Sequence, residues 1–397
     1  MSYKIYLVGT LSTASLTSRF KVRPGPISPG SRFEVQSSRF EVRSSNLQPA
    51  TCNLQPIRVL LPLFRAASLL LLLASAPALP AADSRSAPAQ PLIRITTAHS
   101  TLALSVGNDG RVYQLSYGSS DAPLVRTNHP SRCMEFHPQY GDGFIFEPAL
   151  AATHADGNTS TDLTYVKHSV ASLDPNTALT RIELKDPAYP FFVTLNLKSY
   201  RDQDVIEQWT EIRHDEKSSV TLDRFASSAP VFPAANSYWI THFHGDWAKE
   251  AQWVEERLSS GIKILDSKIG VRADQYRTPL FMLALNHEAR EEEGEVFGGT
   301  LEWSGSFQFA FEMDANECLR VLSGINPFAS HYRLPPGQIF TTPAMLWSWS
   351  GQGKGQVSRN FHRWARRYGI RDGDKPRPVL LNNWEATGFD FDERKII

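Results

Sequence analysis

The chain has 397 residues, of which 41 are Lys or Arg and 41 are Asp or Glu, and its hydrophobic share is 41%. These values are typical of a soluble globular protein with room for two or three domains. Because the formal net charge is zero, electrostatics gives no reason to expect nucleic acid or an anionic membrane as a partner.

Residues 1–57 are predicted to be a low-complexity leader rather than a folded domain. They are rich in Ser, Arg and Pro, and the motif at residues 31–35 returns almost unchanged at residues 38–42. No helical or strand-like hydrophobic period runs through the segment. We expect an over-extended start site here.

Residues 58–81 have the pattern of a secretory signal peptide. Arg58 and Arg65 flank a short apolar run that ends in small residues at Ala78-Leu79-Pro80-Ala81. The run is too short for a permanent membrane span, and a buried helix is the alternative interpretation. We expect cleavage near Ala81, a linker over residues 82–91, and a periplasmic or secreted protein.

Residues 92–355 are predicted to form an all-β domain. Alternating apolar residues at 102–106 and 112–115 flank the turn Asn108-Asp109-Gly110, which indicates a hairpin. Further strands are predicted at 180–184, 191–200, 205–212, 220–225, 238–243, 261–268, 280–286, 295–304, 307–313, 318–324 and 338–349. So many short strands favour two large stacked antiparallel sheets.

The pattern changes to helical in the connecting segment, residues 356–378. Val357, Phe361, Trp364 and Tyr368 fall on one face of a helix, and Gly369 is a typical helix end. A linker with two prolines follows before residue 379.

Residues 379–397 are predicted to begin a second domain. Residues 379–381 are a continuous apolar run, typical of a strand buried in a parallel sheet, and the polar cluster Asn382-Asn383-Trp384-Glu385 follows. In a (β/α) barrel such polar strand ends carry the chemistry. A parallel strand needs neighbours, so we expect the barrel to be truncated here.

Several stretches resemble glycoside hydrolase family 36, the α-galactosidases, in both order and spacing. They include residues 244–250 (HGDWAKE), 294–298 (GEVFG), 335–343 (PPGQIFTTP) and 378–387 (PVLLNNWEAT). The resemblance implies a β-supersandwich, a linking helix and the first strand of a (β/α)8 barrel. It also implies a retaining hydrolase that acts on α-galactosides with two carboxylates.

The resemblance places both catalytic carboxylates on later barrel strands, so no catalytic residue is assigned in this chain and the fragment alone is expected to be inactive. Glu385 and Asp390 are interpreted as helix-start or supporting residues. Two alternatives stay open: a non-catalytic sugar-binding or assembly module, and a mutarotase-like epimerase, which would need His242, His244 and Glu250 to converge.

Three substrate-binding candidates follow from the resemblance. Trp247 matches a family Trp associated with the sugar pocket, reached through the sandwich or a neighbouring subunit, and a loop-anchoring core Trp is its alternative. Trp384 matches the Trp at the end of the first barrel strand, where an indole stacks on a pyranose. The family's Asp after Tyr-Gly-x-Gly is replaced by Phe144, with Asp142 two residues earlier. Asp142 either takes over this contact or belongs to an ordinary turn, the favoured interpretation.

The remaining signals predict neither a metal nor a cofactor. His242 and His244 have no third metal ligand in sequence, and no nucleotide-binding fingerprint occurs. Cys133 and Cys318 could pair in an exported protein or stay as free thiols. A galactoside is therefore the expected partner, and a homo-oligomer is left open.

Overall fold

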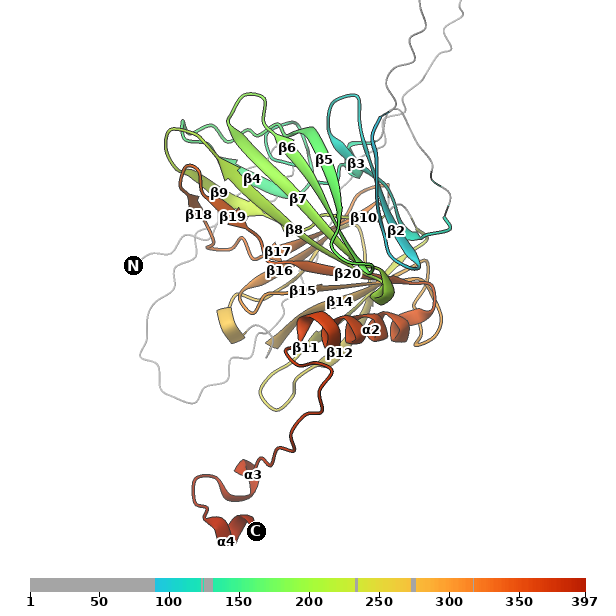
Figure 1. Cartoon of the computed structure of the whole chain (residues 1–397), viewed down its shortest axis with the longest axis vertical. Helices are drawn as coiled ribbons and strands as arrows, with labels where there is room; N and C mark the ends of the chain where they lie inside the picture. Colours follow the sequence, from blue (N-terminus) through green and yellow to red (C-terminus); the bar gives the residue numbers. More distant parts are fainter. Residues whose placement is uncertain (1–89, 123, 125–130, 233–234, 273–275, 317) are drawn as a thin grey trace, which may run out of the picture. The chain divides into compact units, whose positions relative to one another are not determined.

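A computed structural model describes residues 90–122, 124, 131–232, 235–272, 276–316 and 318–397 (Figure 1). The chain divides into two units, Met1–Ala81 and Ala82–Ile397, and every described residue belongs to the second. The predicted leader and signal peptide, and most of the predicted linker, lie outside the described residues. No helix in the described part is long and apolar enough to cross a membrane.

One layer of the domain is a ten-stranded antiparallel sheet (Figure 1). Its strands follow in the order β12 (Gln252–Arg257), β11 (Tyr238–His244), β14 (Arg277–Leu285), β15 (Val296–Leu301), β20 (Met345–Ser350), β8 (Val205–His214), β7 (Phe191–Tyr200), β6 (Thr177–Lys185) and β5 (Thr164–Ser172), and β19 (Ile339–Thr341) also pairs with β8.

Three smaller sheets provide the facing strands. The first contains β10 (Val231–Phe232), β17 (Leu319–Ile325), β16 (Phe307–Met313) and β13 (Gly261–Asp266); the second β1 (Leu92–Thr96), β2 (Ser100–Val106) and β3 (Val112–Ser119); the third β18 (Tyr332–Leu334), β9 (Val220–Phe225) and β4 (Leu150–Thr153). The predicted all-β sandwich is confirmed, with its second layer divided into three parts. The predicted hairpin is the β2–β3 pair.

The core between the layers follows from strand alternation. Phe307, Phe309 and Phe311 of β16 point to one side and are buried. They meet Phe281 of β14 and Trp347 of β20 in one hydrophobic cluster. A second cluster joins β1–β3, β4 and β9 to the β6–β8 part of the large sheet. Burial of these side chains is the main favourable term in folding.

The predicted connecting helix is confirmed and packs on the other face of the large sheet. Helix α2 (Gly353–Trp364) continues as a π-helical turn, Ala365–Gly369, and so ends at the predicted glycine. Val357, Phe361 and Trp364 are buried against Met282 of β14 and neighbouring residues. Helix α2 therefore forms a third layer on this face of the sheet, as Figure 1 shows.

The strand predicted at 338–349 is in fact two strands, β19 and β20. Pro343 lies between them and has no N–H to donate, so the ladder is interrupted there. Thr342 closes the gap: its N–H donates to the Thr210 carbonyl at 2.9 Å, and its Oγ1 accepts from the Thr210 N–H at 2.9 Å. The interruption lets β8 pair with β20 at one end and β19 at the other.

The segment that begins at residue 379 forms two short helices, α3 (Trp384–Thr387) and α4 (Glu393–Ile396). The strand predicted at 379–381 does not form: Val379, Leu380 and Leu381 are 101%, 88% and 68% exposed. No described strand lies beside them to supply hydrogen-bond partners, which a buried parallel strand requires.

The buried imidazole of His137 makes folding stability depend on pH. Burial, helped by the charge of Arg320, lowers the pKa of His137 to about 4. Both ring nitrogens lack a hydrogen-bond partner within the described structure. In an unfolded chain the pKa of His is about 6.5, so the unfolded state binds more protons between these values. The contribution of neutral His137 to the free energy of unfolding is therefore fully present above pH 6.5. It is lost progressively as the pH falls towards 4.

We predict that His137→Met flattens this dependence. Wild-type protein should lose on the order of 3 kcal/mol more unfolding free energy between pH 7 and pH 4 than the variant does. Urea unfolding at several pH values measures both curves, and titrating carboxylates cancel in their difference. Parallel curves would show that His137 is protonated in the folded protein as easily as in the unfolded chain.

Candidate functional site

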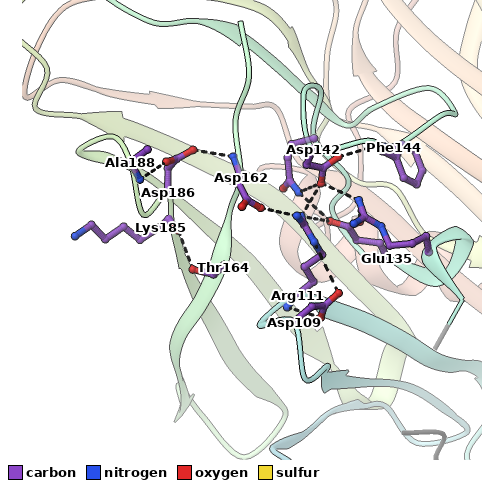
Figure 2. Close-up of polar contacts among 12 residues, drawn as sticks. Asp109, Arg111, Glu135, Asp142, Phe144, Asp162, Thr164, Lys185, Asp186 and Ala188 are labelled. Carbon is purple, nitrogen blue, oxygen red and sulfur yellow. Dashed lines mark hydrogen bonds and ion pairs between the residues drawn. The ribbon is translucent and has the colours of Figure 1, made fainter. Parts of the chain in front are cut away.

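Asp142 lies in a partly buried cluster of charges at the end of the β2–β3 hairpin (Figure 2). Arg111 follows the hairpin turn, and its Nη1 lies 2.6 Å from Asp142 Oδ2. The other end of the guanidinium, Nη2, lies 2.5 Å from Asp162 Oδ1. Glu135 Oε1 is 3.4 Å from Nη1. Asp109 Oδ2, in the hairpin turn itself, lies 3.8 Å from Arg111 Nε. One arginine thus contacts four carboxylates.

The carboxylate of Asp142 is fully engaged within the protein. Its Oδ2 also accepts from Arg132 Nη2 at 2.8 Å and from Gln139 Nε2 at 2.5 Å, and its Oδ1 accepts from the Phe144 N–H at 2.9 Å. The side chain is only 1% exposed. The bond to Phe144 is an Asx-type turn contact, so the geometry fits the ordinary-turn interpretation. A substrate contact by Asp142 stays a prediction.

The charges in this cluster shift each other's protonation. Burial raises the pKa of Glu135 to about 7, although Arg132 and Arg111 oppose the shift. Burial disfavours the charge on Arg111, but the carboxylates of Glu135, Asp142 and Asp162 outweigh it and raise the pKa of Arg111. The guanidinium is therefore the fixed positive centre around which the acidic groups are arranged.

Trp247 lies in the loop that joins β11 to β12. Ala248 and Ala251 have φ values of 60° and 53° in this loop, and the Gly245 N–H donates to the Tyr276 carbonyl at 2.9 Å. The Trp247 side chain is 79% exposed, which does not suit a loop-anchoring core residue. An exposed indole face is suited to stacking on a sugar, and that role for Trp247 stays a prediction.

A second aromatic side chain lies near the start of β12. Trp253 is 58% exposed and meets the edge of Phe243 with ring centroids 6.2 Å apart. The ammonium of Lys354 lies 4.8 Å from the Trp253 ring centroid, a cation–π distance. Sequence reasoning did not single out Trp253, because no strand was predicted over residues 252–257.

Trp384 begins helix α3 and is 50% exposed. Its ring meets Phe389 edge-on with centroids 4.7 Å apart. Asp390 pairs with Lys395 at 2.8 Å, and Asp392 caps α4 by accepting from the Lys395 N–H. The acidic residues near the chain end thus have local helix-start contacts, whereas stacking by Trp384 on a substrate stays a prediction.

The described structure shows no contact among Asp142, Trp247 and Trp384, which lie on three separate loops or helices. It also gives the epimerase alternative no support: His242 Nε2 pairs with Glu256 Oε1 at 2.9 Å. Glu250 instead accepts from the Ala248 N–H at 3.2 Å. The charge cluster around Arg111 has no signal in sequence, because its members come from distant segments.

We predict that Arg111→Met strongly destabilises the domain. Removing the guanidinium leaves the buried Glu135 and Asp142 with Arg132 as their remaining shared cation, and breaking a buried ion pair costs about 3 kcal/mol. The control is Lys167→Met, which removes an exposed pair with Glu183 and should cost less than about 1 kcal/mol. Urea denaturation measures both, and equal losses would show that the cluster is not a stabilising centre.

Comparison with known proteins places this architecture in a family. Residues 102–335 match the glycosyl hydrolase family 36 N-terminal domain, and residues 339–397 match melibiase. The chain is 31% identical over 299 residues to α-galactosidase AgaA of Geobacillus stearothermophilus, which covers 71% of this chain and 40% of that protein. It is 32% identical over 295 residues to α-galactosidase Mel36A of Lactobacillus acidophilus, which covers 70% and 40%.

Solved structures agree with the sequence matches. The crystal structure of AgaA from Geobacillus stearothermophilus superposes with a TM-score of 0.71 at 27% identity, covering 77% of this chain and 47% of that one. Variants of AgaA have been crystallised with 1-deoxygalactonojirimycin and with raffinose. The chain spans about 40% of the length of the curated relatives it matches. On the match to residues 102–335, which is more than half of the sequence, the chain belongs to glycosyl hydrolase family 36.

Proposed function

We propose that this chain is the N-terminal part of an α-galactosidase-type retaining glycoside hydrolase that acts on α-galactosides. The observation that carries the proposal is the order of the two matches: a family-36 N-terminal domain over residues 102–335 is followed directly by melibiase sequence over residues 339–397. Helix α2 lies within the second match, after the last strand of the sandwich. The order along the chain supports the proposal: first the sandwich, then the connecting helix, then the proposed beginning of a catalytic domain.

We place the two carboxylates that break the glycosidic bond outside these 397 residues. Retaining glycosidases use a nucleophilic carboxylate and an acid/base carboxylate about 5 Å apart. Glu385 and Asp390 are exposed residues of the terminal segment, and neither is given such a role. The proposed contribution of this chain is the aromatic surface of Trp247 and Trp384, whose indole faces would stack on sugar rings.

A non-catalytic carbohydrate-binding or assembly module is the second candidate. Its supporting observation is that Trp247 and Trp253, at one end of the β11–β12 hairpin, are both more than half exposed. Large exposed aromatic side chains that lie close in the chain are typical of interaction surfaces. Activity separates the two candidates, because a binding module needs no catalytic pair.

We predict that the purified 397-residue chain releases no nitrophenol from a nitrophenyl α-galactoside. Binding alone cannot replace a missing nucleophile and proton donor. The same assay applies to a longer protein translated from genomic DNA if the reading frame continues past codon 397. That protein should be active, and Trp384→Ala should lower its kcat/KM about tenfold or more through lost stacking.

Lys167→Met in the longer protein is the control, because this exposed residue lies outside the proposed sugar contacts and its activity should stay unchanged. Turnover by the 397-residue chain that survives repurification would place a catalytic pair within it and contradict the proposal. A stop codon directly after codon 397, with sugar binding but no turnover, would favour the binding module.

We also propose that the protein is exported to the periplasm or secreted. Support comes from Arg58 and Arg65 before the apolar run and from the small residues that end at Ala81. We predict that N-terminal sequencing of protein recovered outside the cytoplasm gives a chain that begins near Ala82. An intact N-terminus at Met1 on exported protein would contradict the signal-peptide interpretation.

A further inference from the structure

Cys133 and Cys318 are distant in sequence but adjacent in the fold. Cys133 lies in the short 3-10 helix Arg132–Met134, and Cys318 directly precedes β17. The two Sγ atoms and a carboxylate oxygen of Asp314 all lie within 4.8 Å of one another. Both side chains are partly exposed, so a small oxidant can reach them.

The surroundings of the pair favour a thiolate at one sulfur. Cys133 Sγ lies 3.2 Å from Ser131 Oγ, and the buried guanidinium of Arg320 donates to the Cys133 carbonyl at 2.7 Å. Hydrogen bonding from Cys318, aided by Ser131, lowers the pKa of Cys133 to about 6. The partner thiol, Cys318, has a raised pKa because it keeps its proton to donate that bond. Such an arrangement creates a nucleophilic and a resolving cysteine.

We propose that Cys133 and Cys318 form a redox-active dithiol that oxidises to a disulfide linking the 3-10 helix to β17. The Sγ atoms must approach to about 2.05 Å, which rotation about the Cα–Cβ bonds of two partly exposed side chains can provide. The proposal does not depend on the activity of the protein, because it concerns only these two side chains and their surroundings.

The oxidation uses a disulfide as its electron acceptor. The Cys133 thiolate attacks one sulfur of a small-molecule disulfide, forms a mixed disulfide and expels one thiolate. The Cys318 thiol then passes its proton to a thiolate, attacks Cys133 Sγ and expels the second thiolate. Two protein thiols are oxidised to one disulfide, and one disulfide is reduced to two thiols.

The geometry favours this bond over a metal site. Asp314 Oδ1 already accepts the N–H groups of Asn316 at 2.8 Å and Cys318 at 2.9 Å. The cavity that Cys133, Phe146, Glu312, Asp314, Cys318 and Arg320 line measures about 10 Å³, no more than one water molecule needs. The positive charge of Arg320 also opposes a second cation.

The disulfide would act on the charge cluster as well. Cys133 directly follows Arg132, whose Nη2 lies 3.1 Å from Glu135 Oε2 and 2.8 Å from Asp142 Oδ2. Linking Cys133 to β17 therefore fixes the segment that holds two members of the cluster. A cross-link between residues so far apart in the chain removes much conformational freedom from the unfolded state.

The test exposes the purified protein to glutathione disulfide, then alkylates free thiols and maps the peptides by mass spectrometry. We expect a cross-linked peptide that joins Cys133 to Cys318, with both residues alkylated only after reduction. The oxidised protein should have a melting temperature higher than the reduced protein by roughly 5–10 °C. The double variant Cys133→Ser, Cys318→Ser is the matched control and should melt at one temperature under both conditions.

A second measurement remains informative if the disulfide forms slowly. In the reduced protein the alkylation rate of Cys133 should reach half its maximum near pH 6. Cys318→Ala should move this midpoint upward by about one pH unit or more, because alanine has no group that can donate a hydrogen bond to the Cys133 thiolate. The proposal fails if both thiols are fully alkylated after exposure to glutathione disulfide while the midpoint stays near 8.5 in both proteins. Protection that a chelator removes and a reductant does not would instead show a metal site and also overturn the proposal.

Discussion

Strand β20 is the part on which the rest of the domain depends. It pairs with β15 along one edge and with β8 along the other. It therefore joins the β12–β15 part of the large sheet to the β5–β8 part. Trp347 on this strand is buried against Phe232 and Phe281, and its indole N–H donates to Ser228 Oγ at 3.1 Å. β20 is also the last of the described strands in chain order, so the two parts of the large sheet are joined by the final strand of the domain.

Two adjacent glycines on β15 let both neighbouring layers close on the sheet. A Cβ at Gly298 would lie 2.3 Å from Val357 of helix α2, and a Cβ at Gly299 would lie 2.5 Å from Phe281 on the opposite face. Any side chain at these positions would push the helix or the aromatic core away from the sheet. Since α2 follows β20 closely in the chain, this packing also fixes the direction in which the chain leaves the sandwich.

The sequence predicted those parts of the fold that are rich in apolar, buried side chains. The strands Phe191–Tyr200, Val220–Phe225 and Phe307–Met313 were predicted with the bounds they have, since each carries several apolar side chains that are buried. Strands β5 and β12 were not predicted, because their side chains are mostly exposed and partner strands rather than an apolar period hold them in place.

The same distinction applies to the candidate site. The tryptophans could be selected from sequence because short motifs resemble the family in order and spacing, and the turn interpretation of Asp142 followed from its neighbour Gly143. The cluster around Arg111 could not be predicted, because its carboxylates meet only after separate hairpins and loops have packed. Chain order carries no information on such ion pairs when every member is a common surface residue type.

The internal bonds of Asp142 limit what its loop can offer a substrate. A sugar hydroxyl that used this carboxylate would have to displace contacts to Arg111 and Arg132. A hydrogen bond to a charged group contributes about 1.5–3 kcal/mol, whereas breaking a buried ion pair costs about 3–5 kcal/mol. The exchange is unfavourable, so recognition by this loop would fall to its exposed part. Ile145 in this exposed part is 86% exposed, but its apolar side chain can offer a sugar only van der Waals contact and no hydrogen bond to a hydroxyl.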